Sequence, residues 1–532
     1  MNKIKLLEPL IDEMPSVYAD GVGVEYSKQV NSNHKKKNGQ YFTPTQIARL
    51  MASFSDTKKP EIKILDPGCG TCILTCALIE HLIESVKDLK KIDLTVYETD
   101  PNLISITSNV LKYLQSWLLK KKILFTYNLQ CTDFILQNAS VLNKSRIITL
   151  FEEPNITLNT FDIIISNPPY FKLASDDKRA IAAKELVSGQ SNIYSLFMGI
   201  AAKLLNEDGE LIFITPRSFA SGNYFRAFRE QFFNTVQLKK IHLFNSRKET
   251  FDRDNVLQET VVIKANKEQI DPQKMVLVSS STGIKDIFQP ITKCFTSKDL
   301  IDPKSKEKIL HLPVNDKEEF ILELVAKWKN KLEDFNINIS TGPVVSFRAL
   351  EFIQNNYENG TVSLVPLYWL HNVKKMKLEW PVQFKEKGQY IKLDSQSRSL
   401  LIANKNYIFL RRFSTKDDKS RLIAAPYFCN NAKSDYLGVE NKLNYIYRKN
   451  GHLDRTEAVG LCALLNSELF DTYFQIFNGN VNVSATELRE MRFPPLIAIK
   501  NIGRNIIKTN DYSMENVNNT INTLFESEAI ML

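Results

Sequence analysis

The sequence predicts an α/β protein, with a Rossmann-like domain built on a doubly wound parallel sheet and a C-terminal domain of mixed α+β structure. Between residues 62 and 265, short apolar runs rich in β-branched residues alternate with segments of helical period. The 532 residues also exceed what one hydrophobic core normally serves. Around 266–312 the periodicity is lost and Ser, Lys and Asp accumulate, so we place domains at 1–305 and 306–532.

The first domain begins with a helix over 45–53, which Thr43 can cap while Pro44 takes its first position. The helices that follow are expected at 72–89, 102–119, 192–205 and 224–233. The strands are expected at 62–66, 92–97, 123–129, 161–165, 210–215, 236–244 and 260–265. In the second domain we expect helices over 317–335 and 455–477, short strands between them, and a capping box at 484–487.

Composition narrows the class of protein. Hydrophobic residues make up 43% and charged residues 24%, and no apolar run approaches the length of a membrane span. No signal sequence is apparent, so we expect a cytoplasmic protein without a membrane partner. The seven cysteines are an odd number, which argues against a disulfide framework. Cys69, Cys72 and Cys76 lack a second ligand cluster, so no metal site is expected.

The net charge of +9 is unevenly distributed. Residues 401–450 hold ten Lys and Arg against four Asp and Glu, interleaved with eight Tyr and Phe. Basic residues among aromatic ones suit a nucleic-acid surface, although a solvated face of a β-rich domain explains the pattern equally well.

A rigid corner follows the strand at 161–165. Asn167, Pro168, Pro169 and Tyr170 place a side-chain amide and carbonyl groups where a planar –NH2 group can donate to two acceptors. The ring of Tyr170 can stack on the flat system that carries the amine. Taken alone, this stretch could be an ordinary Pro-Pro turn. The residues at the other strand ends decide whether it forms part of a functional site.

Acidic residues end three earlier strands. Asp66 heads a loop with Gly68 and Gly70, Glu98 ends the second strand, and Asp133 with Phe134 ends the third. The glycine spacing does not match a dinucleotide fingerprint, and an acidic residue there would repel phosphate. A cationic nucleoside without phosphate fits better, and S-adenosyl-L-methionine is such a molecule. Glu98 can accept hydrogen bonds from its ribose hydroxyls.

With these motifs in this order, the chain resembles the γ-class N6-adenine DNA methyltransferases, of the TaqI-like and Eco57I-like kind. The resemblance covers most of residues 35–265 and is weaker at 411–421 and 478–494. It implies that the cofactor is bound by Thr43, Asp66, Gly68, Gly70, Glu98, Asp133, Phe134 and Phe197. An ordinary core role for Phe197 is an equal alternative.

The resemblance also implies roles at the target base. Asn167 and Pro168 would hold the amine within the Asn-Pro-Pro-Tyr motif, Tyr170 would stack on the base, and Tyr41 would lie against it. No aromatic residue stands at 259–265, where relatives can offer a second face, so Tyr41 or Phe251 is expected to serve. Reaching the amine requires the base to leave the duplex.

The function implied is site-specific methylation of adenine N6 in double-stranded DNA, as the modification component of a restriction-modification system. Two alternatives stay open: methylation of another planar amine, in cytosine, RNA or protein glutamine, or DNA binding on a non-catalytic core. The second domain would recognise the target, with Arg411, Arg412, Lys416, Lys419 and Arg421 on phosphates and Asn480 and Asn482 near base edges. We expect a monomer, and a cognate endonuclease, if present, encoded separately.

Overall fold

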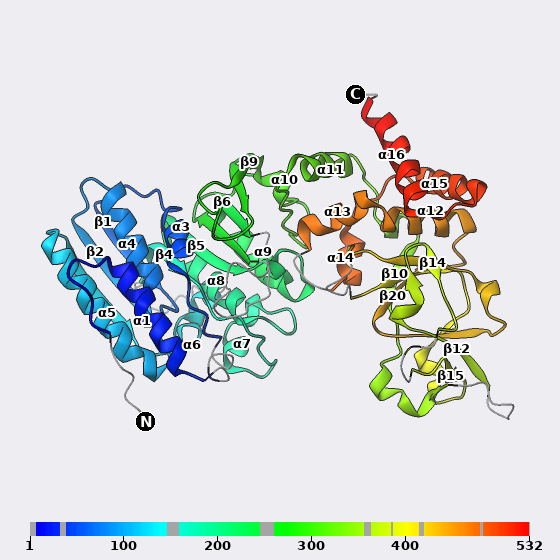
Figure 1. Ribbon diagram of the computed structural model, residues 1–532, viewed down its shortest axis with the longest axis horizontal. Coiled ribbons are helices and arrows are strands. Elements are labelled where there is room, and N and C mark those ends of the chain that lie inside the picture. Colours follow the sequence, from blue (N-terminus) through cyan, green and yellow to red (C-terminus); the bar gives the residue numbers. More distant parts are fainter. Residues whose placement is uncertain are drawn as a thin grey trace, which may run out of the picture. The chain divides into compact units, whose positions relative to one another are not determined.

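The computed structural model describes residues 7–31, 34, 39–145, 159–244, 260–355, 363–382, 384, 387–413, 420–478 and 482–530. The chain forms two compact units, Met1–Val314 and Asn315–Leu532 (Figure 1). The division falls nine residues after the boundary placed at 305/306 from composition, because 306–314 pack on the first unit: the Leu310 amide donates to the Ala220 carbonyl at 2.9 Å.

The first unit is built on one nine-stranded sheet in the order β3-β2-β1-β4-β5-β7-β6-β8-β9. The five strands from β3 to β5 run parallel, and β7 lies antiparallel to both of its neighbours. This confirms the predicted α/β class. The strands are β1 (Glu61–Asp66), β2 (Lys91–Tyr97), β3 (Leu124–Gln130), β4 (Phe161–Ser166), β5 (Leu205–Pro216), β6 (Gln237–Phe244), β7 (Thr260–Asn266), β8 (Met275–Ser281) and β9 (Ile291–Thr296).

Helices cover both faces of this sheet (Figure 1). One core includes side chains of α1 (Pro15–Gln29), α3 (Thr45–Ala52), α4 (Ile73–Ser85) and α5 (Pro101–Lys120); the other includes those of α6 (Phe134–Asn138), α8 (Ile193–Leu204) and α9 (Arg226–Phe233). Strand alternation divides β4 between them, since Ile163 and Ile165 join the first core and Ile164 the second. Phe161 also joins the second core, because the strand register shifts between Phe161 and Ile163. The short helices α7 (Lys178–Ala182) and α10 (Ser297–Leu300) complete the unit.

Two strands were not expected from the sequence. β8 and β9 form a hairpin at the edge of the sheet, within the stretch 266–312 that reads as irregular. The serines of β8 obscure its strand character, but two of them satisfy a buried side chain: Ser279 and Ser281 each lie 2.9 Å from a ring nitrogen of His242.

The second unit combines small sheets with helices. Its sheets have the orders β10-β20-β17-β18, β11-β15-β12-β19-β16 and β13-β14. The strands are β10 (Ile337–Thr341), β11 (Ile353–Gln354), β12 (Leu364–Tyr368), β13 (Val373–Lys374), β14 (Lys377–Leu378), β15 (Tyr390–Lys392), β16 (Leu401–Ala403), β17 (Tyr407–Arg411), β18 (Ala424–Tyr427), β19 (Tyr436–Val439) and β20 (Leu443–Arg448).

Its helices are α11 (Asp316–Ala326), α12 (Arg455–Asn466), α13 (Glu468–Phe477), α14 (Ala485–Glu490), α15 (Leu496–Thr509) and α16 (Met514–Ile530). The single helix predicted over 455–477 is in fact α12 and α13. Ser467 takes an extended conformation and caps α13 by accepting from the Phe470 amide. Among the helices of the described residues, none is both long and apolar enough to cross a membrane.

Candidate active site

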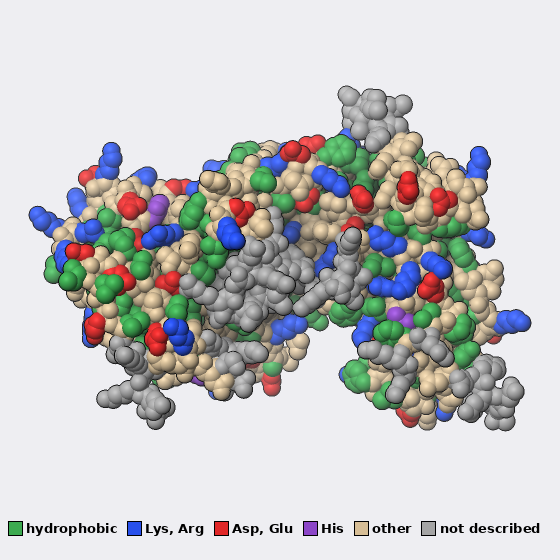
Figure 2. Space-filling view, in the orientation of Figure 1, with side chains coloured by type: hydrophobic (Ala, Val, Ile, Leu, Met, Phe, Trp, Pro, Cys, Tyr) green, Lys and Arg blue, Asp and Glu red, His purple; other side chains and the backbone are tan. Residues whose placement is uncertain are grey.

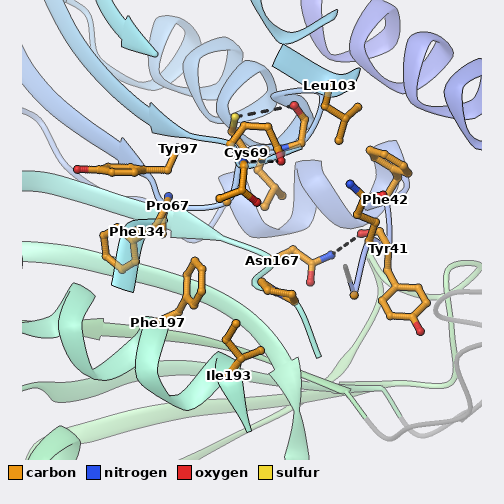
Figure 3. Close-up of a pocket in the computed structure, with 18 of the residues that line it drawn as sticks. Tyr41, Phe42, Pro67, Cys69, Tyr97, Leu103, Phe134, Asn167, Ile193 and Phe197 are labelled. Atoms are coloured by element: carbon orange, nitrogen blue, oxygen red, sulfur yellow. Dashed lines mark hydrogen bonds between the residues drawn. The ribbon is translucent and has the colours of Figure 1, made fainter. Parts of the chain in front are cut away.

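A cavity of about 320 Å³ opens where the loops after β1, β2, β3 and β4 meet the segment 39–43 (Figure 3). Because these strands are parallel, their carboxyl ends share one edge of the sheet, and residues far apart in sequence converge there. The predicted site residues that line the cavity are Tyr41, Thr43, Gly68, Gly70, Glu98, Asp133, Phe134, Asn167, Pro169 and Phe197.

The glycine loop after β1 is held in a shape that keeps its backbone open to the cavity. Gly70 has a φ of +52°, and a side chain there would be strained as well as close to Phe42. The Gly70 amide donates to Glu98 at 3.1 Å, and the Cys69 amide donates to the Tyr97 carbonyl at 3.0 Å. The loop is thereby fixed to the end of β2.

Asp66 requires a correction, because it does not line the cavity. Its carboxylate is completely buried beneath the loop, where it accepts from the Thr75 hydroxyl at 2.9 Å and lies 3.4 Å from the Gly68 amide. Burial raises the pKa of Asp66 to about 7. The residue therefore supports the loop that lines the site instead of reaching into the cavity.

Glu98 faces the cavity while organising the turn after β2. Its Oε1 accepts from the Thr99 and Asp100 amides, both at 2.8 Å, and burial raises its pKa. A carboxylate has more lone pairs than these bonds use, so it can still accept from ligand hydroxyls. This fits the ribose diol of S-adenosyl-L-methionine.

An aromatic wall closes the other side of the cavity (Figure 3). The ring centroid of Phe134 lies 5.3 Å from that of Tyr97 and 5.2 Å from that of Phe197. Asp133 caps α6 at this wall, accepting from the Leu136 amide at 3.0 Å. Such a wall fits the flat adenine of the cofactor. Phe197 lines the cavity and is also part of the hydrophobic core, so both of its expected roles stay open.

Other lining residues were not identified from the sequence. Tyr97 carries a usable signal, because it directly precedes Glu98 at a strand end. Arg179, which reaches the cavity from α7, carries no such signal in the sequence. Its guanidinium forms two hydrogen bonds with Asp177, at 2.9 and 2.6 Å, and lies 3.9 Å from the Asp133 carboxylate.

The orientation of the Asn167 amide is set by the segment that precedes α3. Its Nδ2 donates to the Tyr41 carbonyl at 3.2 Å and to the Thr43 hydroxyl at 3.0 Å (Figure 3). Since a backbone carbonyl can only accept, the amide nitrogen must face Tyr41, and the amide oxygen points the other way. There it accepts from the Tyr170 hydroxyl at 2.6 Å.

The Tyr170 hydroxyl has a second acceptor, the Ile214 carbonyl at 3.0 Å. The hydroxyl has one proton, so it can donate its main hydrogen bond to only one of these two acceptors at a time. Turning toward Ile214 leaves the Asn167 oxygen available to an incoming donor. Burial raises the pKa of Tyr170 well above its ordinary value, so the hydroxyl stays protonated.

Two tyrosine rings face each other beside this amide. The centroids of Tyr41 and Tyr170 are 6.2 Å apart and the ring planes differ by 25°. This centroid distance lies in the ordinary range for a pair of aromatic rings. Of the two residues considered for the second stacking face, Tyr41 faces Tyr170, and Phe251 lies outside the described residues.

A buried carboxylate that was not singled out from the sequence holds segment 39–43 in place. Asp100 accepts from the Tyr26 hydroxyl at 2.8 Å and the Gln40 amide at 2.7 Å, and lies 2.8 Å from His34 Nε2. Burial alone would raise the pKa of Asp100, but these hydrogen bonds lower it to about 2. The same loop therefore carries Glu98 and anchors the segment that orients Asn167.

The residues predicted to contact DNA have different surroundings. Arg411 is a correction: it is buried in β17, with Nε donating to the Val373 carbonyl at 2.8 Å, because its side chain takes the inward position of the strand.

Arg412 bonds to the Asn441 carbonyl and Arg421 to Asn478, both partly buried. Asn482 pairs with Phe413 in an isolated bridge. Lys416, Lys419 and Asn480 lie outside the described residues.

Comparison with known proteins places the chain in a family. A family model described as the Eco57I restriction-modification methylase matches residues 88–251. The type II methyltransferase M.BsuBI of Bacillus subtilis is 34% identical over 487 residues, covering 91% of this chain and 92% of that protein. The type II methyltransferase M.PstI of Providencia stuartii is 30% identical over 491 residues, covering 92% and 94%. The chain therefore belongs to the Eco57I family of type II DNA methyltransferases from restriction-modification systems, with S-adenosyl-L-methionine as methyl donor.

Proposed function

We propose that this enzyme methylates the N6 amine of an adenine that has rotated out of duplex DNA. The observation that carries the proposal is the orientation of Asn167. Its amide oxygen is directed away from segment 39–43 and toward Tyr170, beside a cavity whose walls suit S-adenosyl-L-methionine. This orientation supports a role for that oxygen as the acceptor of a hydrogen bond from a planar amine.

The chemistry asked of the protein is to make a poor nucleophile better. The lone pair of an exocyclic adenine amine is delocalised into the ring. The Asn167 oxygen and the Pro168 carbonyl would accept hydrogen bonds from the two N–H groups of the amine. These hydrogen bonds would favour a more tetrahedral nitrogen with a localised lone pair. S-adenosyl-L-methionine supplies the electrophilic methyl group. No histidine lines the cavity in the described part of the chain, in keeping with a mechanism that needs no strong base.

The stacking roles follow from the tyrosine pair. Tyr41 and Tyr170 would hold the extruded base between their rings, with its amine toward Asn167. Stacking of a base on an aromatic side chain contributes about 1–3 kcal/mol, comparable to the few kcal/mol that extrusion costs. The pair would thus offset much of the cost of removing the base from the helix.

The second unit would recognise the target sequence in double-stranded DNA. Figure 2 shows Lys and Arg side chains gathered on this face over the strands of that unit.

We propose a monomer that acts in the cytoplasm. A cognate endonuclease would be encoded separately and recognise the same sites without forming a complex.

Replacing the acceptor tests the proposal. Asn167→Ala is expected to lower transfer of labelled methyl groups to unmethylated bacterial DNA by about 100- to 1000-fold, the effect of removing one polar group that acts in the transition state. Binding of S-adenosyl-L-methionine in calorimetry should persist. Asn102→Ala, exposed on α5, is the matched control and should stay active.

The product decides between substrates. Digestion of the methylated DNA to nucleosides and mass spectrometry should detect N6-methyladenine. N4-methylcytosine as the product, or methyl incorporation into RNA or protein but not DNA, would refute the adenine assignment.

A further inference from the structure

An apolar tip projects from the second unit in a short stretch that follows β10. Residues 346–352, the Phe347 tip, form two 3-10 turns. Phe347 and Leu350 are each 70% exposed, although both are large apolar side chains. The Arg348 guanidinium lies over the Phe347 ring, 5.4 Å from its centroid. Two exposed apolar residues flanking an arginine make a contact surface of mixed character.

The tip rests on a rigid base. The Val344 amide donates to the Val439 carbonyl at 3.0 Å, and the Val344 carbonyl accepts from the Asn441 amide at 2.8 Å. A side chain on Gly342 would collide with the Glu440 carbonyl, 2.2 Å from the added carbon, so the chain lies flat against that turn. Within the tip, the buried Ala349 donates to the Val345 carbonyl at 3.1 Å. The exposed side chains are therefore presented by a fixed backbone.

The tip itself is neutral, because it holds Arg348 and the exposed Glu351, so the charge of the strand-rich stretch that carries it is what points to its partner. Residues 337–448, from β10 to β20, contain 17 Lys and Arg and 9 Asp and Glu, a net charge of +8 out of +9 for the whole chain. Arg412 and Lys442 stand at the base of the tip, since the Arg412 amide donates to the Lys442 carbonyl at 2.9 Å and its guanidinium to Asn441 at 2.7 Å. Such a concentration of positive charge is complementary to the DNA backbone.

We propose that the Phe347 tip inserts into the base stack of the bound duplex. Phe347 and Leu350 are the wedge, and Arg348 contacts an adjacent phosphate. Phe and Leu are the side chains that other proteins place between base steps to unstack them. The inference rests on the proposed function, and deepens it: insertion beside the target base would remove part of the stacking of that base and so lower the cost of extracting it.

The test uses a duplex carrying the methylation site, found by sequencing modified bases in DNA from cells that express the protein. 2-Aminopurine replaces the base next to the target adenine, and its fluorescence rises when that adenine leaves the stack; at the target position itself, stacking between Tyr41 and Tyr170 would quench it. The full-length wild type should give a strong rise. Phe347→Ala should reduce the rise and the methylation rate about tenfold, while the slope of log affinity against log salt stays unchanged, because phosphate contacts remain.

Matched variants separate a wedge from a general loss of structure. Phe320→Ala removes another exposed phenylalanine of the same unit, 51% exposed on α11, and should behave as wild type. Phe347→Leu keeps an apolar wedge and should retain most of the fluorescence rise. Arg348→Ala should lower the salt slope by about 0.9.

The outcomes are distinguishable. A wild type that methylates no DNA base overturns the proposed function itself. A wild type that is active, with Phe347→Ala giving the same fluorescence rise, overturns the wedge alone. So does a Phe347→Ala protein with normal DNA behaviour but an altered oligomeric state in light scattering, since the tip would then bind a protein.

Discussion

At the scale of single residues, Thr43 was predicted to contact the cofactor, and its hydroxyl also bonds to the Asn167 amide. Its hydroxyl accepts from Asn167 Nδ2 at 3.0 Å, so it helps keep the amide oxygen toward the substrate. Thr43→Val preserves the shape but removes the acceptor. We expect the methyl-transfer rate to fall about tenfold, because an unsatisfied buried donor costs about 1–3 kcal/mol.

Thr43→Ser supplies the control, since it keeps the hydroxyl and should restore most of the rate. Single-turnover transfer and calorimetric titration with S-adenosyl-L-methionine measure the two effects separately. Loss of cofactor affinity in step with the rate in Thr43→Val would instead make Thr43 a direct cofactor ligand.

Strand-end position was enough to predict that Glu98, Phe134 and Asn167 line one cavity, because residues that follow parallel strands must converge at one edge of the sheet. It was not enough for Asp66, and the cluster of basic residues at 401–450 was not enough for Arg411. Whether a side chain faces a cavity or the layer beneath depends on the torsions of a loop or on what packs against a strand. Asp66 turns toward Thr75 and Arg411 toward Val373, and neither partner is marked in the sequence.

At the scale of elements, the β1–α4 loop depends on a carboxyl group that prefers to be neutral. Burial raises the pKa of Asp66 to about 7, above an ordinary value near 3.9 in an unfolded chain. The folded protein then binds more protons than the unfolded chain between these values, so its stability falls as the pH rises through 7.

Cofactor-free protein should therefore gain about 1 kcal/mol of unfolding free energy, through this group, when the pH is lowered from 8 to 6. Asp66→Asn removes the group and should lack this part of the pH dependence; Glu98 is common to both proteins and cancels in the comparison. Urea unfolding at the two pH values measures the difference. Identical pH dependence in variant and wild type would mean that Asp66 is ionised in the folded state.

Elements with a strong period were predicted, and elements defined by tertiary partners were not. The helices over 45–53 and 192–205 and the strand at 161–165 appear almost as expected, since their apolar residues face a core. The break at Ser467 was missed, because the apolar period continues through it; the preceding Asn466 is held by a tertiary partner, with its buried amide bonded to both the amide and the carbonyl of Ala424 on β18.

At the scale of the whole molecule, charge is divided between the parts of the second unit. The strand-rich stretch 337–448 has a net charge of +8, whereas its helical remainder, 315–336 and 449–532, has 11 Lys and Arg against 16 Asp and Glu, a net −5. Under the proposed function, we expect that the strand-rich part approaches the DNA backbone and that the acidic helical part does not.

The division of charge gives a prediction with a built-in comparison. Lys442, at the turn before β20, has a side chain 51% exposed, and Lys508 is exposed on α15. Lys442→Ala should reduce the slope of log affinity against log salt by about 0.9, the loss of one phosphate contact, and weaken all DNA sequences alike. Lys508→Ala removes the same charge from the acidic helical part and should leave the slope unchanged. Equal slopes for both variants would assign the positive strands to an ordinary solvated face, and equal reductions would extend the DNA contact to the helices.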